Sequence, residues 1–185
     1  MFTLSQELVK SLPKKSLDEL KSFEQQSCLP TFDYNTAFNL GCQLRQWGVE
    51  NFPTKAMVID ISLPSGQCVF HTTTNSGTAL DNDIWVARKK KTVVRFGCSS
   101  YFMGQKLKSK KLDRVEDAFY IDSKEYAVHG GSIPVFVQGI DSAVAILTVS
   151  GLKQEEDHAF AVSAIIEYAQ QLKSAEMEDS NLDLD

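Results

Sequence analysis

The chain has 185 residues, a hydrophobic share of 43% and a formal net charge of -5 at pH 7. This length fits one domain with extensions, and the hydrophobic share is sufficient for a substantial core. No apolar run approaches the roughly 20 residues of a membrane-spanning helix. The first residues also lack the basic segment followed by an apolar run that marks a secretory signal, so a soluble, cytoplasmic protein is predicted.

Two short amphipathic helices are predicted within residues 1–30. The spacings from Thr3 to Gln6 and from Ser16 to Glu19 are those of capping boxes, and Pro13 separates the two segments. Helices this short are not stable alone, so we expect this extension to rest on the domain or on a neighbouring subunit.

The next elements are a helix and a β-hairpin. The helix begins at Asp33 and runs to about Val49, with an apolar face formed by Ala37, Phe38, Leu44 and Trp47. Two strands, Met57 to Leu63 and Gln67 to Thr73, follow around a Pro-Ser-Gly turn. Asp60 lies within the first strand, and a solvent-facing or capped carboxylate is a better interpretation of it than a catalytic acid.

A further helix is predicted from Thr78 to about Arg95, with Leu80, Ile84, Trp85 and Val86 as its apolar residues. It contains the basic run from Arg88 to Lys91, in which we expect Arg88 to point inward and the three lysines to stay in water. Four charges in a neutral domain are too few to bind a nucleic-acid backbone. A solvated or subunit-bridging helix face is therefore expected.

The remaining elements form the centre of the predicted domain. A helix from Ser99 to about Lys108 precedes two buried strands, Ile133 to Val137 and Ala143 to Val149, and a long helix from Lys153 to Lys173. A fifth strand is predicted near Phe119 to Asp122. Hairpins joined by helices indicate an α+β fold, with a mainly antiparallel sheet of about five strands and helices packed on it.

Three segments of this central region resemble a known family. They are His129-Gly-Gly-Ser-Ile-Pro-Val135, Ala145-Ile-Leu-Thr-Val-Ser-Gly151 and Gln154-Glu-Glu-Asp-His158, and they resemble the GlcG/HbpS-like heme-degrading-domain superfamily. That resemblance implies a profilin-like sandwich for residues 31–173, binding of heme or cobalamin-related ligands in bacterial relatives, and rings assembled from dimers.

Two longer strings resemble one branch of this superfamily more narrowly. Asp81 to Lys91 and Ser150 to His158 resemble the fungal branch associated with the guided-entry pathway for tail-anchored membrane proteins. The resemblance implies a homo-oligomer, a decamer, that partners with a TPR-domain co-chaperone.

A candidate ligand pocket is predicted around the glycine pair after His129. Paired glycines can turn backbone N–H groups towards one anion, and the start of the last helix adds positive potential. The predicted pocket residues are His129, Gly130, Gly131, Ser150, Gly151, Asp157, His158 and Arg88. The alternative is a tight turn whose glycines serve backbone geometry alone.

Catalytic and metal-binding motifs are missing from the sequence. No Ser/His/Asp order, phosphate-binding glycine pattern or CxxCH segment is present, which favours a protein without catalytic residues or a cofactor, heme being the alternative. His71 is interpreted as a strand residue satisfied by a neighbour. The four cysteines, Cys28, Cys42, Cys68 and Cys98, lack ligand spacing, so reduced thiols and no metal site are predicted.

The negative charge of the chain lies at its C-terminal end. Five acidic residues and no basic one follow Lys173, which leaves 19 of the 24 acidic residues against 19 basic ones in residues 1–173. Residues 174–185 are therefore predicted to be a flexible acidic tail.

The tail ends in a pattern that suits recognition by another protein. Leu182 and Leu184 alternate with Asp183 and Asp185, and TPR carboxylate clamps bind short acidic ends of this kind, although the strict Glu-Glu-Val-Asp ending is absent. The leading interpretation is a non-enzymatic accessory protein whose end binds a TPR co-chaperone. A solubilising tail and a heme-binding or small-molecule-binding domain are the alternatives.

Overall fold

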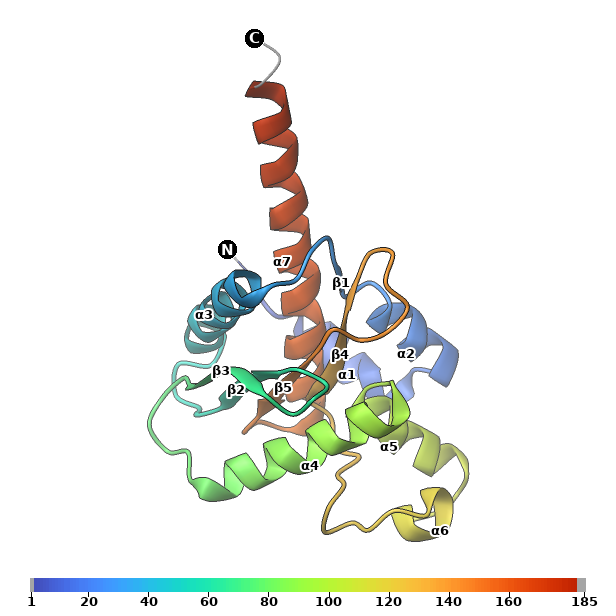
Figure 1. Ribbon diagram of the computed structural model, residues 1–185. Helices are drawn as coiled ribbons and strands as arrows, with labels where there is room; N and C mark the ends of the chain where they lie inside the picture. Colours follow the sequence, from blue (N-terminus) through green and yellow to red (C-terminus); the bar gives the residue numbers. More distant parts are fainter. Residues whose placement is uncertain (1, 183–185) are drawn as a thin grey trace.

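The computed structural model describes residues 2–182, with side chains up to residue 175. Five strands form one sheet in the order β1-β4-β5-β2-β3, in which β1 runs parallel to β4 and the other neighbours are antiparallel (Figure 1). The predicted α+β architecture with a mainly antiparallel sheet is confirmed. The elements are α1 (Gln6–Ser11), a 3-10 turn (Leu12–Lys14), α2 (Leu17–Glu24), β1 (Cys28–Leu29), α3 (Tyr34–Asn51), β2 (Val58–Ser62), β3 (Cys68–Thr73), α4 (Leu80–Phe96), α5 (Ser100–Ser109), α6 (Val115–Phe119), β4 (Ser132–Val137), β5 (Ala145–Ser150) and α7 (Gln154–Leu182).

The two faces of the sheet differ in polarity. Alternate strand residues point to one face, and on the side of α3 and α7 they form the main apolar core, which includes Ile59, Leu147 and Val149. The intervening residues point to the other face, on the side where α4 and α5 lie (Figure 1), and many of them are polar. Asp60 belongs to this second set and is only 3% exposed, and its carboxylate accepts hydrogen bonds from Ser62 and Lys90. Of its two predicted positions, the solvent-facing one is therefore wrong and the capped carboxylate is the one observed.

The N-terminal extension packs on its own domain. Leu12 and Leu20 are fully buried in the main core, and Phe2 packs against Trp47 with ring centroids 4.9 Å apart. The capping box of α2 is confirmed, because Ser16 N–H donates to Glu19 at 2.7 Å and Ser16 Oγ accepts from the Glu19 N–H at 3.2 Å. The cap of α1 is Ser5 rather than the predicted Thr3.

The fifth strand does not lie where the sequence predicted it. Residues 115–119 form α6, which ends when Tyr120 adopts a left-handed conformation with φ of 57°. The fifth strand is instead the two-residue β1, whose Cys28 pairs with Phe136 of β4. A strand this short leaves no periodic signal in the sequence.

Some predicted apolar helix faces point outward. Phe38 of α3 is 59% exposed, and in α4 Leu80 is 76% exposed and Ile84 is 50% exposed. The stripe that α4 turns towards the sheet consists of Val86, Lys89, Thr92 and Val93. Because the polar face of the sheet receives α4, the buried stripe of this helix is also partly polar.

The last helix is longer than the sequence predicted. It continues past Lys173 to Leu182, because no Gly or Pro interrupts it and Ala, Glu and Met favour helix. Its first half packs on the sheet, and its second half stands clear of the domain (Figure 1). Within residues 2–182, no helix has both the length and the apolar composition needed to cross a membrane.

Candidate functional site

His129 lies where the segment after α6 enters β4. The two glycines that follow are packed against the main chain: a Cβ on Gly130 would collide with the Gln154 carbonyl, and one on Gly131 with the Val149 carbonyl. Gly131 also has a φ of +121°, which side chains rarely adopt. Close approach of β4 to β5 and α7 is thus sufficient to explain the glycine pair, and it fixes the place of His129.

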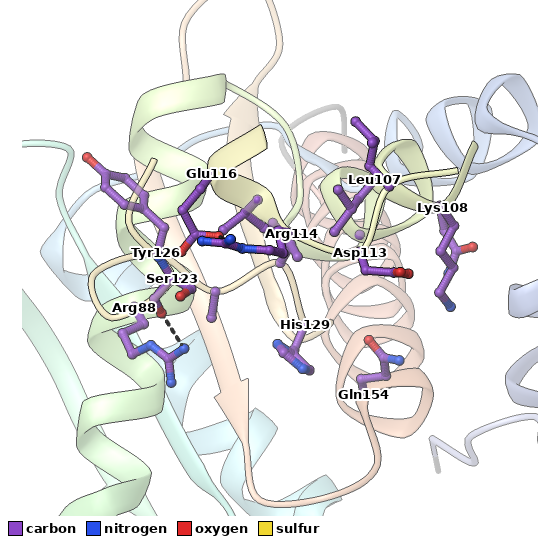
Figure 2. Close-up of a pocket in the computed structure, with 16 residues that line it drawn as sticks. Arg88, Leu107, Lys108, Asp113, Arg114, Glu116, Ser123, Tyr126, His129 and Gln154 are labelled. Carbon is purple, nitrogen blue, oxygen red and sulfur yellow. Dashed lines mark hydrogen bonds and ion pairs between the residues drawn. The ribbon is translucent and has the colours of Figure 1, made fainter. Parts of the chain in front are cut away.

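Two neighbouring cavities share the side chains of His129 and Gln154. The larger has a volume of about 460 Å³ and is shown in Figure 2. The smaller has a volume of about 310 Å³ and lies over the start of α7. Cavities that bind small molecules usually have volumes of about 300–1,000 Å³. The larger is lined by Arg88, Gly104, Gln105, Leu107, Lys108, Leu112, Asp113, Arg114, Val115, Glu116, Ser123, Tyr126, Ala127, Val128, His129 and Gln154, and the smaller by Asp81, Asn82, Trp85, Lys89, His129, Ser150, Gly151, Leu152, Gln154 and Asp157.

Cations surround the imidazole of His129. Burial lowers the pKa of His129 below its ordinary value, and the nearby Lys89, Arg88 and Lys108 lower it further. The ring packs edge-on against Trp85 at 4.9 Å, and the Arg88 guanidinium lies over the same indole at 4.4 Å. A neutral imidazole among positive charges makes this part of the larger cavity suitable for an anion.

Arg88 is held at the rim of the larger cavity. Its guanidinium donates to the Ser123 carbonyl at 2.6 Å (Figure 2) and is partly exposed. Arg88 is half-buried and its Nε is enclosed, so it turns partly inward, whereas the expectation that all three lysines stay in water is wrong for Lys89.

Lys89 is the buried member of the basic run. Its Nζ lies 3.0 Å from Asp157 Oδ2 and 3.2 Å from the Val149 carbonyl, and the two side chains are 4% and 2% exposed. Asp157 Oδ1 accepts from the Leu152 N–H at 3.1 Å. Burial raises the pKa of Asp157, while Lys89 opposes that rise. This ion pair joins α4, β5 and α7 at the base of the smaller cavity.

His158 does not join these cavities, which corrects the prediction. It is fully buried, and its ring stacks on Tyr101 at 4.6 Å while Nε2 lies 3.4 Å from Glu24 Oε1. Burial lowers the pKa of His158 to about 3 and raises that of Glu24 to about 7. Consecutive residues of a helix point about 100° apart, so Asp157 faces α4 whereas His158 faces α2 and α5.

Comparison with known proteins identifies the family. The family model described as "Haem degrading protein HbpS-like" matches residues 32–166. The chain belongs to the HbpS-like family. It is 49% identical over 186 residues to the UPF0303 protein YBR137W of Saccharomyces cerevisiae, covering 99% of this chain and 100% of that one.

Two solved structures have folds similar to this one. The crystal structure of Ybr137w has a TM-score of 0.88 and 48% identity, covering 91% of this chain and 98% of that one. The PduOC:heme complex has a TM-score of 0.57 and 16% identity, covering 73% of this chain and 93% of that one. The second similarity establishes a shared fold.

The HbpS-like fold thus assembles part of the predicted pocket. His129, Ser150, Gly151 and Asp157 line the smaller cavity, while Arg88 meets His129 at the larger one. Lys89, Trp85 and Gln154 also line these cavities, and the sequence did not predict them as pocket residues. Trp85 and Lys89 are four residues apart in the predicted helix, a spacing that indicates a shared face. Asp183, Leu184, Asp185 and the side chain of Leu182 lie outside the described residues.

Proposed function

We propose that this HbpS-like protein is a non-enzymatic, oligomeric accessory protein that binds a TPR-domain co-chaperone through residues 182–185, in the targeting of tail-anchored membrane proteins. The observation that carries the proposal is the direction of α7. Its side chains are buried as far as Ala169, and those from Lys173 to Ala175 are exposed. The backbone then continues as helix to Leu182, away from the domain (Figure 1).

The length of this projection separates the recognition segment from the domain surface. The thirteen residues from Gln170 to Leu182 extend the helix by about 20 Å at ~1.5 Å per residue. A TPR groove that encloses a short peptide can therefore approach the end of the chain without meeting the sheet or α3.

The end of α7 is also suited to unwinding. Glu176, Glu178 and Asp179 lie near its C-terminal end, where negative charge opposes the helix dipole by about 0.3–1 kcal/mol per residue. Helix ends without tertiary packing fray readily. Leu182 can therefore leave the helix at small free-energy cost and join the next three residues in an extended conformation that fills the groove.

The expected affinity of one tail is modest. Ordering a short peptide offsets part of the contact energy, so we expect a Kd on the order of micromolar for a single tail. Several tails on one homo-oligomer would strengthen binding through effective concentration. Leu182 and Leu184 would occupy apolar pockets, while the carboxylates of Asp183, Asp185 and the chain end meet basic side chains.

The test compares full-length protein with a variant lacking residues 181–185, using isolated TPR domains and fluorescence or calorimetric titration. The truncated protein is expected to fold normally and to lose binding. A Ser180–Asp185 peptide with a free carboxylate should bind, and its C-terminal amide should bind at least tenfold more weakly. An Asn181→Ala variant is the matched control and should bind normally. Equal binding by the truncated protein would refute the proposal.

The larger cavity supports a second candidate function, binding of heme or another anionic small molecule. A heme would need an axial ligand, apolar walls and cations for its propionates. His129, the apolar residues Leu107, Val115 and Val128, and the basic residues Arg88, Lys108 and Arg114 supply these groups. Bound heme would contribute iron-centred redox chemistry. His158, enclosed by Tyr101 and Phe23, is unsuited to this role.

Hemin titration tests this second function. Binding at the cavity predicts a stoichiometric shift of the Soret band and a higher Tm, both lost in His129→Ala. His71→Ala is the matched control, because this half-exposed histidine lies outside the cavity. A Soret shift that His129→Ala leaves unchanged would count against the assignment, as would no shift at all.

A further inference from the structure

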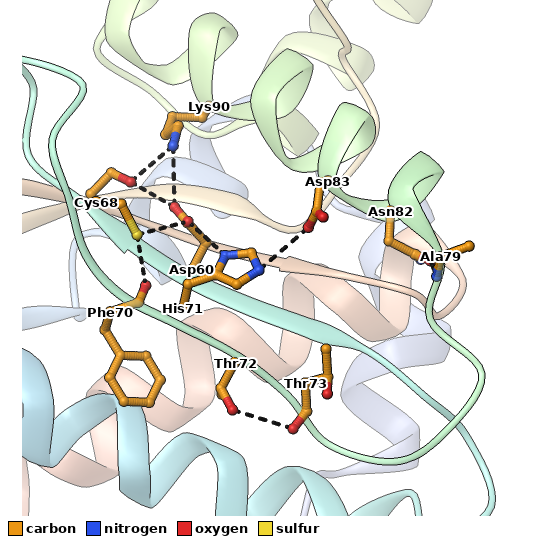
Figure 3. Close-up of polar contacts among 11 residues, drawn as sticks. Asp60, Cys68, Phe70, His71, Thr72, Thr73, Ala79, Asn82, Asp83 and Lys90 are labelled. Atoms are coloured by element: carbon orange, nitrogen blue, oxygen red, sulfur yellow. Dashed lines mark hydrogen bonds and ion pairs between the residues drawn. The ribbon is translucent and has the colours of Figure 1, made fainter.

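A separate cluster of polar side chains lies between the β2–β3 hairpin and α4 (Figure 3). It comprises Asp60 from β2, Cys68 and His71 from β3, and Asp83 and Lys90 from α4. None of these residues lines the two cavities around His129.

A β-bulge brings the donors of β3 to one face of the hairpin. Ile61 pairs with Phe70 but Ser62 pairs with Cys68, so Val69 is an extra residue in β3. In a regular strand, residues three apart point to opposite faces. The bulge cancels this alternation, so Cys68 and His71 both turn towards Asp60, which pairs directly with His71.

The three side chains offer ligand atoms at metal-site spacing. Asp60 Oδ2 lies 3.1 Å from His71 Nδ1 and 3.5 Å from Cys68 Sγ. In a tetrahedral zinc site, bonds of about 2.0 Å to N or O and about 2.3 Å to S place ligand atoms roughly 3.3–3.5 Å apart. Each of the three residues offers a ligand atom within 4.8 Å of the other two, and a shift of the Cys68 side chain brings the set to bonding distance.

Both ring nitrogens of His71 face carboxylates. Nδ1 faces Asp60 Oδ2 at 3.1 Å, and Nε2 lies 3.3 Å from Asp83 Oδ1. A neutral imidazole has one N–H and can donate to only one of them. The other contact therefore requires a second ring proton or a cation between the two acceptors. Ligating histidines commonly donate the remaining N–H to a carboxylate, and Asp83 Oδ1, a buried oxygen without a hydrogen-bond partner among the described residues, lies within 3.3 Å of Nε2.

The Asp60 carboxylate is fixed through its other oxygen. Oδ1 accepts from Ser62 Oγ at 2.7 Å and from Lys90 Nζ at 3.3 Å, and Lys90 also donates to Ser62 at 2.8 Å. The Asp60 side chain is 5% exposed. Oδ2 is thus left facing Cys68 and His71, in an orientation that needs no rearrangement on metal binding.

We propose that Asp60, Cys68 and His71 form a Zn²⁺ site. The ligand atoms are Asp60 Oδ2, Cys68 Sγ and His71 Nδ1, and water completes the tetrahedron from the exposed side of β3. Formation of the S–Zn bond releases the Cys68 thiol proton to solvent, and any proton on His71 Nδ1 leaves in the same step. The thiolate and the Asp60 carboxylate balance the two charges of the ion. The spacing of these residues along the chain did not predict a metal site, because strand pairing assembles it.

Cobalt titration of the reduced full-length protein tests the proposal, since Co²⁺ reports both thiolate ligation and geometry. We expect one equivalent to give a thiolate-to-cobalt charge-transfer band and intense tetrahedral d–d bands, which Zn²⁺ then abolishes. Cys68→Ser should lose the charge-transfer band, and His71→Gln should bind at least tenfold more weakly. Asp83→Asn should weaken affinity by about 10–100-fold.

Cys42→Ser is the matched control, because Cys42 is also an exposed cysteine but lies on α3. It should leave the spectrum and the stoichiometry unchanged. Far-UV circular dichroism of each metal-free variant checks that the fold is retained. The absence of a stoichiometric cobalt spectrum in the wild type would overturn the assignment, as would a charge-transfer band that survives in Cys68→Ser.

Discussion

Replacing Lys89 by Met tests whether the buried Lys89–Asp157 ion pair stabilises the packing of α4 against β5 and α7. The substitution keeps the length and apolar stem of the side chain but removes the ammonium from Asp157 Oδ2 and the Val149 carbonyl. Asp157 is 1% exposed, so its charge cannot be solvated in place. Breaking one side of a buried pair costs about 3–5 kcal/mol. At roughly 2–4 °C per kcal/mol, the Tm should fall by about 6–20 °C.

The same variant has a characteristic pH dependence. Burial already raises the pKa of Asp157, and loss of the ammonium raises it further. Between the unfolded and folded pKa values the folded state then binds more protons than the unfolded state, so stability falls as pH rises. The deficit relative to wild type should therefore be smaller near pH 4 than at pH 7.

Urea unfolding followed by circular dichroism at several pH values measures both effects. Lys91→Met is the matched control: it makes the same change two residues later, where the side chain pairs with Glu125 at the surface, and it should leave the Tm unchanged. Lys89→Met with Asp157→Leu should recover most of the stability, because no unpaired charge remains. A loss below about 1 kcal/mol for Lys89→Met, or a deficit independent of pH, would refute the reasoning.

Three further predictions concern other buried features. Glu24→Gln should gain stability relative to wild type as pH rises from 4.5 to about 7, because folded Glu24 keeps a proton in that window that the unfolded chain loses; equal differences at pH 5 and pH 8 in urea titrations would contradict this. Gly131→Ala should lower the free energy of unfolding by about 2 kcal/mol or more, because Gly131 has a φ of +121° and an added Cβ would collide with the Val149 carbonyl. The control Gly139→Ala should lower the free energy of unfolding by less, because Gly139 has a φ of +78° and open space around it. Leu12→Ala should lower the free energy of unfolding by about 2–5 kcal/mol, since the Leu12 side chain is fully buried. The control Leu80→Ala should change it little, because Leu80 is 76% exposed. A Leu12→Ala protein as stable as wild type in urea titrations would show that the N-terminal extension does not belong to the core.

The most accurate sequence predictions concern short-range signals. The α2 capping box, the start of α3 at Asp33 and the β2–β3 hairpin depend on residues a few positions apart, and all three are present within one residue of their predicted places. The apolar strands β4 and β5 were also predicted, because they are short β-branched runs bounded by glycine. These features follow from local geometry, which the order of residues fixes directly.

The residues that line the candidate pocket are decided by contacts between helices and strands that lie far apart in the sequence. Arg88 and Lys89 are adjacent and both basic, so only the angle at which α4 meets the sheet decides which one is buried. Asp157 and His158 are likewise adjacent, and the packing of α7 places Asp157 against α4 and His158 against α5. Helix periodicity gives relative directions along a helix but does not identify the neighbour that each face meets.

The sequence by itself determined the caps, the β2–β3 hairpin, the strands β4 and β5 and the acidic composition after Lys173, because each is set by contiguous residues, and together these elements indicated the α+β class. Tertiary structure alone decided that one face of the sheet is polar, that Lys89 is buried against Asp157, and that a bulge turns Cys68 and His71 towards Asp60. These contacts join residues from different elements. Their existence depends on strand register and on the way helices pack, which are properties of the whole fold.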